Sequence, residues 1–228
     1  MQIFIDSSDL DEIREALDYG VSGVTTNPTT MAKAEEGMAV RARAIAIIAG
    51  PERPVSLQVV GPQEPVDLIK EAKQLWKVAG NVVVKIPATA AGLRAVRSLC
   101  PEAWNAPVNV TLVFSPTQAL IAAQNGAWCV SPFLCRWKDY NFPDWQTDPS
   151  GVRYAGIDFL CSIVDAVKGT RCKVLAASIR SVEDVEDAIE AGCGICTVSL
   201  KVLKQMMEHP KTEEGLAKFM ADWAVVQQ

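Results

Sequence analysis

Short apolar runs recur along the chain and alternate with stretches of helical periodicity. The runs are rich in Val and Ile, which is typical of strands buried on both faces. Strands are expected at residues 2–6, 21–27, 55–60, 82–87, 107–113, 128–134, 173–178 and 195–200. A helix is expected after each strand, among them residues 90–99, 116–125, 152–167 and 182–191.

Strand–helix alternation predicts parallel pairing, and eight such units without a linker predict an α/β fold. The expected architecture is a single (β/α)8 barrel over residues 1–228, with an extra C-terminal helix. A doubly wound open sheet is the alternative. No Gly-rich dinucleotide-binding turn follows the first strand, which disfavours it.

Three local expectations refine this pattern. Residues 7–9, Ser-Ser-Asp, are expected to cap the first helix, and Thr29 or Thr30 the helix after Asn27-Pro28. A long loop rich in Trp, Asp and Pro is expected between the sixth strand and residue 152.

The extra helix, over residues 212–228, lies beyond the eighth unit. Its apolar residues fall on one face: Leu216, Phe219, Met220, Trp223 and Val226. Because the barrel's own helices are already accounted for, this face needs another partner. The helix either folds back over the barrel or packs on another subunit.

Lys85 interrupts the most apolar run, Val82-Val83-Val84-Lys85-Ile86-Pro87. A lysine buried in such a strand loses hydration, which disfavours its charged form. The resulting amine is a nucleophile that can form a Schiff base with a carbonyl substrate. The alternative is a strand-end lysine whose ammonium reaches solvent.

In a barrel of this kind the active site lies at the carboxyl ends of the strands. Polar residues occur near almost every such end, more often than solubility requires, and this favours an enzyme. The candidates are Asp6, Thr26, Asn27, Gln58, Lys85, Asn109, Thr111, Ser131, Phe133, Arg136, Ser178 and Arg180.

Composition and charge exclude several other classes. The formal net charge of −5 argues against a nucleic-acid partner. The uncharged stretch between Glu102 and Arg136 contains polar residues and two prolines, so no membrane span is expected. The N-terminus lacks a basic region followed by an apolar run, which predicts a cytoplasmic protein without a signal peptide.

Seven scattered cysteines and one histidine, His209, give no pattern for a metal site. An odd number of cysteines without a secretory signal indicates reduced thiols that fill the core. Cys193 and Cys196 have the spacing of a redox motif, but they straddle the start of a predicted strand.

Six segments at strand ends resemble motifs of the transaldolase family, which includes the fructose-6-phosphate aldolases. They are Phe4-Ile5-Asp6-Ser7, Gly23-Val24-Thr25-Thr26-Asn27-Pro28, Val83-Val84-Lys85-Ile86-Pro87, Asn109-Val110-Thr111-Leu112-Val113-Phe114-Ser115, Ser131-Pro132-Phe133 with Arg136, and Ala176-Ala177-Ser178-Ile179-Arg180. The resemblance covers nearly the whole chain. It implies a barrel enzyme that uses a lysine Schiff base and needs neither a metal nor a cofactor.

The resemblance also implies catalytic roles. Lys85 would attack the ketose carbonyl at C2, and Asp6 would take the proton of the C4 hydroxyl. Thr111 and Gln58 would hold the water that shuttles protons. The alternative for Asp6 is a solvated acid or the cap of the first helix.

The implied substrate-binding residues form two groups. The first group resembles ligands of the dihydroxyacetone hydroxyls and consists of Asn27, Asn109 and Ser131. Thr26 and Phe133 are counted with this group. A role in a turn is the alternative for Asn27. Arg136, Ser178 and Arg180 resemble the site of the terminal phosphate, since two guanidinium groups can bind a dianion. Either arginine alone is more often a surface residue paired with a carboxylate.

The sequence departs from the family pattern in three places. The family's transaldolases carry glutamate at the position of Gln58, where its aldolases carry glutamine. Its aldolases carry tyrosine at the position of Phe133, where its transaldolases carry phenylalanine. Residues 138–150 form a longer segment than the short family members show. Aromatic residues lie in or beside this segment: Trp137, Tyr140, Phe142 and Trp145. Within it, Asp139 resembles the acidic residue after the family's arginine.

The leading hypothesis is a transaldolase that transfers a dihydroxyacetone unit between phosphorylated sugars. The alternatives are an aldolase that releases dihydroxyacetone, a variant acting on another anionic ketose such as a sulfonated one, and a barrel that binds without catalysis. The resemblance further implies a homo-oligomer built of pentameric rings, either a pentamer or a decamer.

Overall fold

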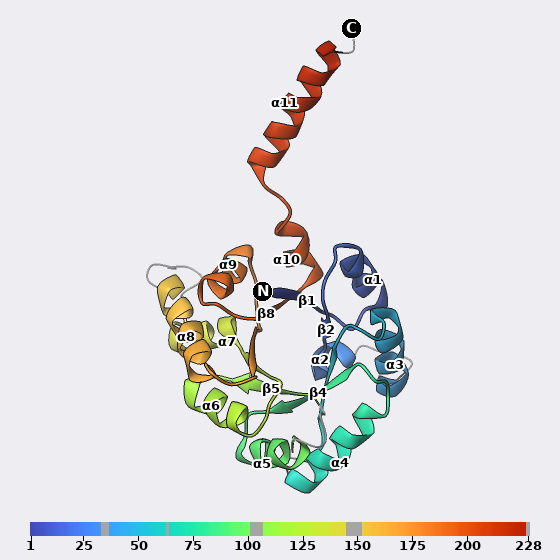
Figure 1. The fold of residues 1–228 in the computed structure, drawn as a ribbon, viewed down its shortest axis with the longest axis vertical. Helices are drawn as coiled ribbons and strands as arrows, with labels where there is room; N and C mark the ends of the chain where they lie inside the picture. Colours follow the sequence, from blue (N-terminus) through green and yellow to red (C-terminus); the bar gives the residue numbers. More distant parts are fainter. Residues whose placement is uncertain (33–36, 63, 101–106, 145–151, 227–228) are drawn as a thin grey trace.

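Eight parallel strands close into a barrel in the computed structural model, which describes residues 1–32, 37–62, 64–100, 107–144 and 152–226 (Figure 1). The strands are β1 (Gln2–Asp6), β2 (Val24–Thr25), β3 (Val55–Gln58), β4 (Val82–Pro87), β5 (Val108–Val113), β6 (Cys129–Pro132), β7 (Lys173–Ala176) and β8 (Ile195–Val198). They pair in sequence order, and β1 also pairs with β8, which closes the ring. The predicted (β/α)8 barrel is therefore confirmed.

Helices surround the barrel, as Figure 1 shows. They are α1 (Leu10–Asp18), α2 (Pro28–Met31), α3 (Met38–Ala49), α4 (Pro65–Trp76), α5 (Ala90–Leu99), α6 (Pro116–Gln124), α7 (Leu134–Asn141), α8 (Val152–Ala166), α9 (Val182–Glu190), α10 (Leu200–Gln205) and α11 (Pro210–Val226). Among the described residues, none of these helices is both long enough and apolar enough to cross a lipid bilayer.

Two predictions of local structure were wrong. The first half of the expected loop after β6 is the helix α7, which buries Leu134, Cys135 and Lys138 on one face; residues 145–151, including Trp145, lie outside the described part. The second error concerns the start of α2. Asn27, rather than Thr29 or Thr30, caps this helix, because Pro28 can occupy the first helical position without a backbone donor.

The strand after α1 is also shorter than expected. β2 comprises two residues instead of seven, and it pairs with β1 and β3 only over Val24 and Thr25. The cap of α1 lies within the predicted segment: the side chain of Asp9 accepts hydrogen bonds from the backbone of Asp11 and Glu12.

A small apolar cluster fills the barrel below its polar end. Its members are Phe4, Cys129, Leu175, Ala177 and Ile195. Because side chains alternate along a strand, Phe4 shares the inward face of β1 with Asp6, and Cys129 shares the inward face of β6 with Ser131. The larger core lies between the strands and the surrounding helices. The polar residues at the strand ends therefore rest on a packed apolar floor.

The seven cysteines are free thiols; six pack in or against the two apolar clusters, and Cys135 is buried and donates to Asp184. Cys100 and Cys161 are partly buried, and the other five are buried. This confirms the prediction that they act as core residues.

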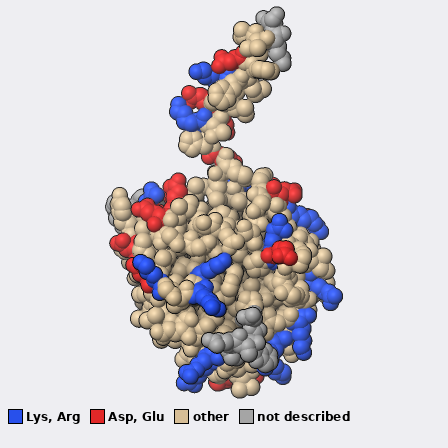
Figure 2. Space-filling model, in the orientation of Figure 1, with Lys and Arg blue, Asp and Glu red and all other residues tan. Residues whose placement is uncertain are grey.

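The helix α11 projects away from the barrel (Figure 1). None of its described residues is buried, and Phe219 and Trp223 are 71% and 62% exposed. The helix does not fold back over the barrel. Lys, Arg, Asp and Glu side chains are spread over the visible face of the barrel, and both signs of charge occur on α11 (Figure 2).

Candidate active site

The strand register brings the predicted catalytic residues to one end of the barrel. Lys85 on β4 pairs with Gln58 at the end of β3 and with Asn109 on β5, and Thr111 pairs with Pro87 one step further along. Asp6 ends β1. Residues that lie far apart in the sequence therefore surround the end of the Lys85 side chain.

Lys85 is buried, with 3% of its surface exposed. Burial lowers the pKa of its ammonium group, and the charge of Arg136 acts in the same direction, while the carboxylate of Asp6 opposes them. The Nζ atom donates a hydrogen bond of 3.3 Å to the backbone oxygen of Thr26. The solvent-reaching alternative is excluded, because this amine points into the barrel and is shifted toward its neutral, nucleophilic form.

The strand that carries Lys85 is held by a close helix contact. Thr89 caps α5 by accepting a hydrogen bond from the backbone of Gly92. A Cβ atom at position 92 would collide with the backbone oxygen of Pro87, so only glycine lets α5 start this near to the end of β4. The helix therefore limits the movement of the strand just after Lys85.

Asp6 is held by the hydroxyl of Thr25, which in turn bonds Thr197; the sequence analysis selected neither threonine. Thr25 donates to its Oδ1 atom at 2.9 Å, and the Oγ1 atoms of Thr25 and Thr197 lie 2.6 Å apart. Because Asp9 caps α1, the carboxylate of Asp6 is not needed as a cap. The sequence feature that could have identified these threonines as site residues is their inward-facing position within apolar strands.

Asn109 and Ser131 form one buried polar chain. Ser131 Oγ donates to Asn109 Oδ1 at 2.7 Å, and Asn109 Nδ2 donates to Ser56 Oγ at 3.4 Å. The chain fixes the orientation of the Asn109 amide beside Lys85, its partner in strand register. Ser56 is a further residue that the sequence analysis missed.

Thr111 differs from these residues, because its buried hydroxyl has no hydrogen-bond partner among the described residues. It lies at an irregular part of β5, where the register with β6 shifts between Val110 and Val113 and Leu112 adopts a φ of 57°. Irregular strand ends and positive φ values are costly, and they concentrate where a side chain must be aimed at a site. A buried hydroxyl without a partner is available to bind a water molecule or a substrate.

Thr26, Asn27 and Gln58 line one narrow crevice beside the barrel mouth. The side-chain oxygen of Asn27 accepts from the backbone of Thr30, so the turn role considered for this residue is present. Its amide nitrogen is the side-chain group that this cap leaves for a ligand.

Phe133 lies close to both Lys85 and Arg136. The Lys85 Nζ atom lies 5.8 Å from the centre of the Phe133 ring, and the guanidinium carbon of Arg136 lies 5.1 Å from it. Both distances are in the range of cation–π contacts. Phe114 packs against the same ring at 6.1 Å between centroids. One aromatic ring is therefore within cation–π range of both the Lys85 amine and the arginine of the predicted anion site.

A pocket of about 490 Å³ lies beside Arg136. Its lining residues are Phe114, Arg136, Trp137, Tyr140 and Asn141. Most of them come from α7, the helix that replaces the first part of the expected loop. The pocket provides space beside Arg136 for the far end of a substrate.

Arg180 is paired with a carboxylate in this structure. Its guanidinium donates two hydrogen bonds to Asp139 of α7, at 2.9 and 2.6 Å, and these bonds raise the pKa of the arginine. Ser178, two residues earlier, has a φ of 60°. The surface pairing considered for an isolated arginine is therefore present, and it fixes Arg180 to the same helix that carries Arg136.

A family model described as transaldolase/fructose-6-phosphate aldolase matches residues 3–228. The chain is 42% identical over 236 residues to a protein of Dehalococcoides mccartyi named probable transaldolase, with 100% of each chain covered. It is 40% identical over 226 residues to a probable transaldolase of Alkaliphilus metalliredigens, with 98% of each covered.

Solved structures of other barrels are similar in fold. One is a 3-hexulose-6-phosphate synthase, with a TM-score of 0.60 and 18% identity, covering 87% of this chain and 90% of that one. Another is a thiamine phosphate pyrophosphorylase from Pyrococcus furiosus, with a TM-score of 0.58 and 15% identity over 87% and 85% of the two chains. At this identity the likeness concerns the fold alone.

The unpartnered hydroxyl of Thr111 leads to a prediction about stability and turnover. Thr111→Val removes a buried polar group without breaking a hydrogen bond within the protein, so the melting temperature should stay the same or rise. Turnover in an aldol-cleavage assay should fall by about 10²-fold, which is the scale of a lost proton-transfer aid.

Thr25→Val is the matched control, because the Thr25 hydroxyl bonds both Asp6 and Thr197. It should lower the stability by about 1–3 kcal/mol, since Asp6 loses a donor. A lower melting temperature for Thr111→Val than for the unchanged protein would show that the hydroxyl has a structural partner.

Proposed function

The chain belongs to the transaldolase/fructose-6-phosphate aldolase family and is an aldolase-type enzyme, and from this premise we propose that it is a transaldolase acting through a Schiff base on Lys85. The proposed reaction moves a dihydroxyacetone unit from a phosphorylated ketose, such as fructose 6-phosphate or sedoheptulose 7-phosphate, to an aldose phosphate. The observation that carries it is the buried amine of Lys85 with its lowered pKa, facing the carboxylate of Asp6.

The first step joins Lys85 to the ketose. The neutral amine attacks the carbonyl carbon C2, and loss of water from the adduct leaves an iminium ion. A water molecule held by Thr111 and Gln58 carries the protons of this step. The unpartnered hydroxyl of Thr111 and the strand pairing of Gln58 with Lys85 support this assignment.

The second step breaks the C3–C4 bond. Asp6 takes the proton of the C4 hydroxyl, an aldehyde leaves, and the electron pair of the broken bond moves into the iminium to form an enamine. The hydroxyl of Thr25 holds the carboxylate in place for this transfer. Addition of the enamine to an acceptor aldehyde reverses these steps and returns the proton.

The remaining polar residues hold the substrate. Asn109 and Ser131 lie beside Lys85 and bind the hydroxyl groups of the dihydroxyacetone unit, together with the amide of Asn27. Arg136, Ser178 and Arg180 bind the anionic group at the far end. A barrel that only binds ligands has no need of a buried amine with a lowered pKa, so the catalytic proposal is preferred to a binding protein.

The apolar face of α11 supports a further proposal, that the protein is a homo-oligomer. The large side chains on this helix are 59–74% exposed, and the helix lies away from its own barrel. An exposed apolar surface of this kind is typical of a protein contact. A second copy of the chain is the proposed occupant, in rings of five subunits.

Trapping with borohydride tests the Schiff base. Treatment in the presence of fructose 6-phosphate should add a mass of dihydroxyacetone size to the peptide containing Lys85, measured by mass spectrometry. Lys85→Arg should abolish both labelling and turnover, because a guanidine with a pKa above about 12 stays charged. Lys173→Arg, at an exposed position of β7, should leave both intact. Labelling at another residue, or none, would refute the mechanism.

The residue at position 133 tests whether the enzyme transfers or releases dihydroxyacetone. Phenylalanine offers no proton donor to the enamine, so transfer to erythrose 4-phosphate should be faster than release. Phe133→Tyr should shift the balance toward release, since a phenol can donate a proton there. Phe114→Tyr, on the ring that packs against Phe133, is the control.

Both products should be measured from fructose 6-phosphate with and without the acceptor. Equal release in both conditions, without formation of sedoheptulose 7-phosphate, would identify the protein as an aldolase. Gln58 is the one residue that favours this outcome. A sulfonated ketose assayed beside the phosphorylated one identifies the anionic group.

Light scattering tests the assembly. The unchanged protein should have the mass of a pentamer or decamer at micromolar concentration, and a monomer would exclude the proposal. Trp223→Asp places a charge on the apolar face of α11 and should lower the mass. Lys218→Asp, on the same helix but off that face, should not.

A further inference from the structure

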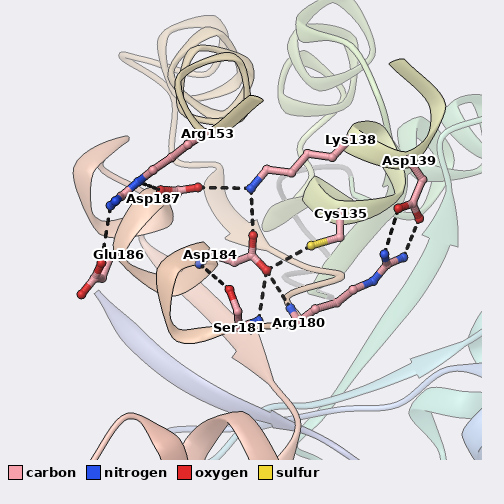
Figure 3. Close-up of polar contacts among 9 residues, drawn as sticks. All are labelled: Cys135, Lys138, Asp139, Arg153, Arg180, Ser181, Asp184, Glu186 and Asp187. Carbon is pink, nitrogen blue, oxygen red and sulfur yellow. Dashed lines mark hydrogen bonds and ion pairs between the residues drawn. The ribbon is translucent and has the colours of Figure 1, made fainter. Parts of the chain in front are cut away.

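A buried ionic cluster lies beside Arg180, one of the two proposed anion-binding arginines (Figure 3). Its centre is Lys138 on α7, which is 3% exposed and paired with Asp184 and Asp187 on α9, which are 2% and 1% exposed. The Nζ atom lies 2.8 Å from Asp184 Oδ1 and 3.2 Å from Asp187 Oδ2. Gly156 on α8 makes room for it, because a Cβ atom there would clash with the lysine side chain.

The surroundings favour the charged forms of Lys138 and Asp184. Burial alone would lower the pKa of Lys138, but the hydrogen bonds and charges of Asp184 and Asp187 outweigh it and raise this pKa. Burial would raise the pKa of Asp184, yet Lys138 and the backbone of Arg180 hold it below its usual value. Arg153 donates to Asp187 at 2.9 Å and supplies the second positive charge.

Such a cluster contributes little to stability on its own. The cost of removing charges from water is comparable to their mutual attraction, so apolar residues in the same space often serve equally well. The hydrogen-bond geometry of Asp184 points to a different role.

The two oxygens of Asp184 have different partners, as Figure 3 shows. Oδ1 accepts from Lys138. Oδ2 accepts from the backbone nitrogens of Arg180 and Ser181, at 2.9 and 3.1 Å, and from the thiol of Cys135 at 3.1 Å. One carboxylate therefore joins α7 to the segment that follows β7.

Arg180 is consequently fixed at both ends. Its backbone nitrogen is held by Asp184, and its guanidinium is held by Asp139 of α7. The backbone nitrogen of Cys135 also donates to the oxygen of Ser178, at 3.2 Å. Arg136 lies on the same helix between Cys135 and Lys138. The position of Arg180 relative to Arg136 thus depends on the bond between α7 and Asp184.

We propose that Asp184, held by Lys138, is a positioning residue that sets the distance between Arg136 and Arg180 and so determines binding of the substrate's anionic group. This inference rests on the proposed role of the two arginines. The other half of the cluster, Asp187 with Arg153, touches neither the segment after β7 nor an arginine of the site among the described contacts, and it serves the packing of α8 on α9.

This asymmetry provides a matched pair of variants. Asp184→Asn and Asp187→Asn each replace one buried carboxylate with an amide, and each keeps the other of the two carboxylates described beside Lys138. Asparagine has a single acceptor oxygen, so at position 184 it cannot serve both Lys138 and the backbone of Arg180. Lys138→Met and Arg153→Met form a second pair, which removes the cation from each half and remains informative if Asp184→Asn does not fold.

The KM values for fructose 6-phosphate and for unphosphorylated fructose are the readout. Asp184→Asn and Lys138→Met should raise the KM for the phosphate ester roughly 10-fold or more relative to that for fructose, since small displacements of binding groups have effects of this size or larger. Asp187→Asn and Arg153→Met should leave the ratio unchanged even where they lower the melting temperature. Equal changes in both halves, or a constant ratio in all four variants, would overturn the inference.

Stabilisation by inorganic phosphate gives a readout that does not depend on turnover. Phosphate should raise the melting temperature of the unchanged protein and of Asp187→Asn, and less so that of Asp184→Asn. Equal shifts, or no shift in the unchanged protein, would also count against the inference. Failure of the Schiff-base proposal is recognised separately, by absence of borohydride labelling at Lys85 while these phosphate shifts persist.

Discussion

The removal of the Lys85 amine from water is the constraint on which the site depends. A charged ammonium is costly to bury, so a lysine inside a strand is tolerated only if its proton is easily lost or its charge is balanced. Here the nearest strong influence of opposite sign is Asp6, on the first strand, and Arg136 acts against it. The same balance that favours the neutral amine keeps a carboxylate within electrostatic reach of it.

Closure of the barrel brings the other polar residues of the site next to Lys85. The eight strands are short, and several of them pair over only two to four residues, yet their register places Gln58, Lys85 and Asn109 side by side. Beneath them the apolar cluster around Phe4 prevents the polar groups from sinking further into the barrel. Above them the ring of Phe133 lies within cation–π range of both Lys85 and Arg136, so these two cations share one aromatic neighbour.

Features that depend on local pattern were predictable from the sequence, and those that depend on distant partners were not. The apolar residues around Lys85 indicate a buried strand, and the polar residues at strand ends indicate a site. In contrast, the sequence places Lys138 and Asp139 in a loop, because their partners Asp184 and Arg180 lie more than 40 residues later in the chain. The helix α7 was missed for this reason. Thr25, Thr197 and Ser56 were missed because a small hydroxyl side chain in an apolar strand does not differ visibly from a residue that only packs there.

The buried thiols have a consequence for the chemistry of the intact protein in an oxidising medium. Burial raises the pKa of Cys100 to about 11 and that of Cys172 to about 12, so very little thiolate is present at neutral pH. The thiolate is the form that reacts with peroxides and disulfides. These two side chains therefore react very slowly with either while the barrel is folded. They become reactive only when the chain unfolds. The rate at which a thiol reagent modifies Cys100 and Cys172 therefore measures the rate of unfolding without an added label.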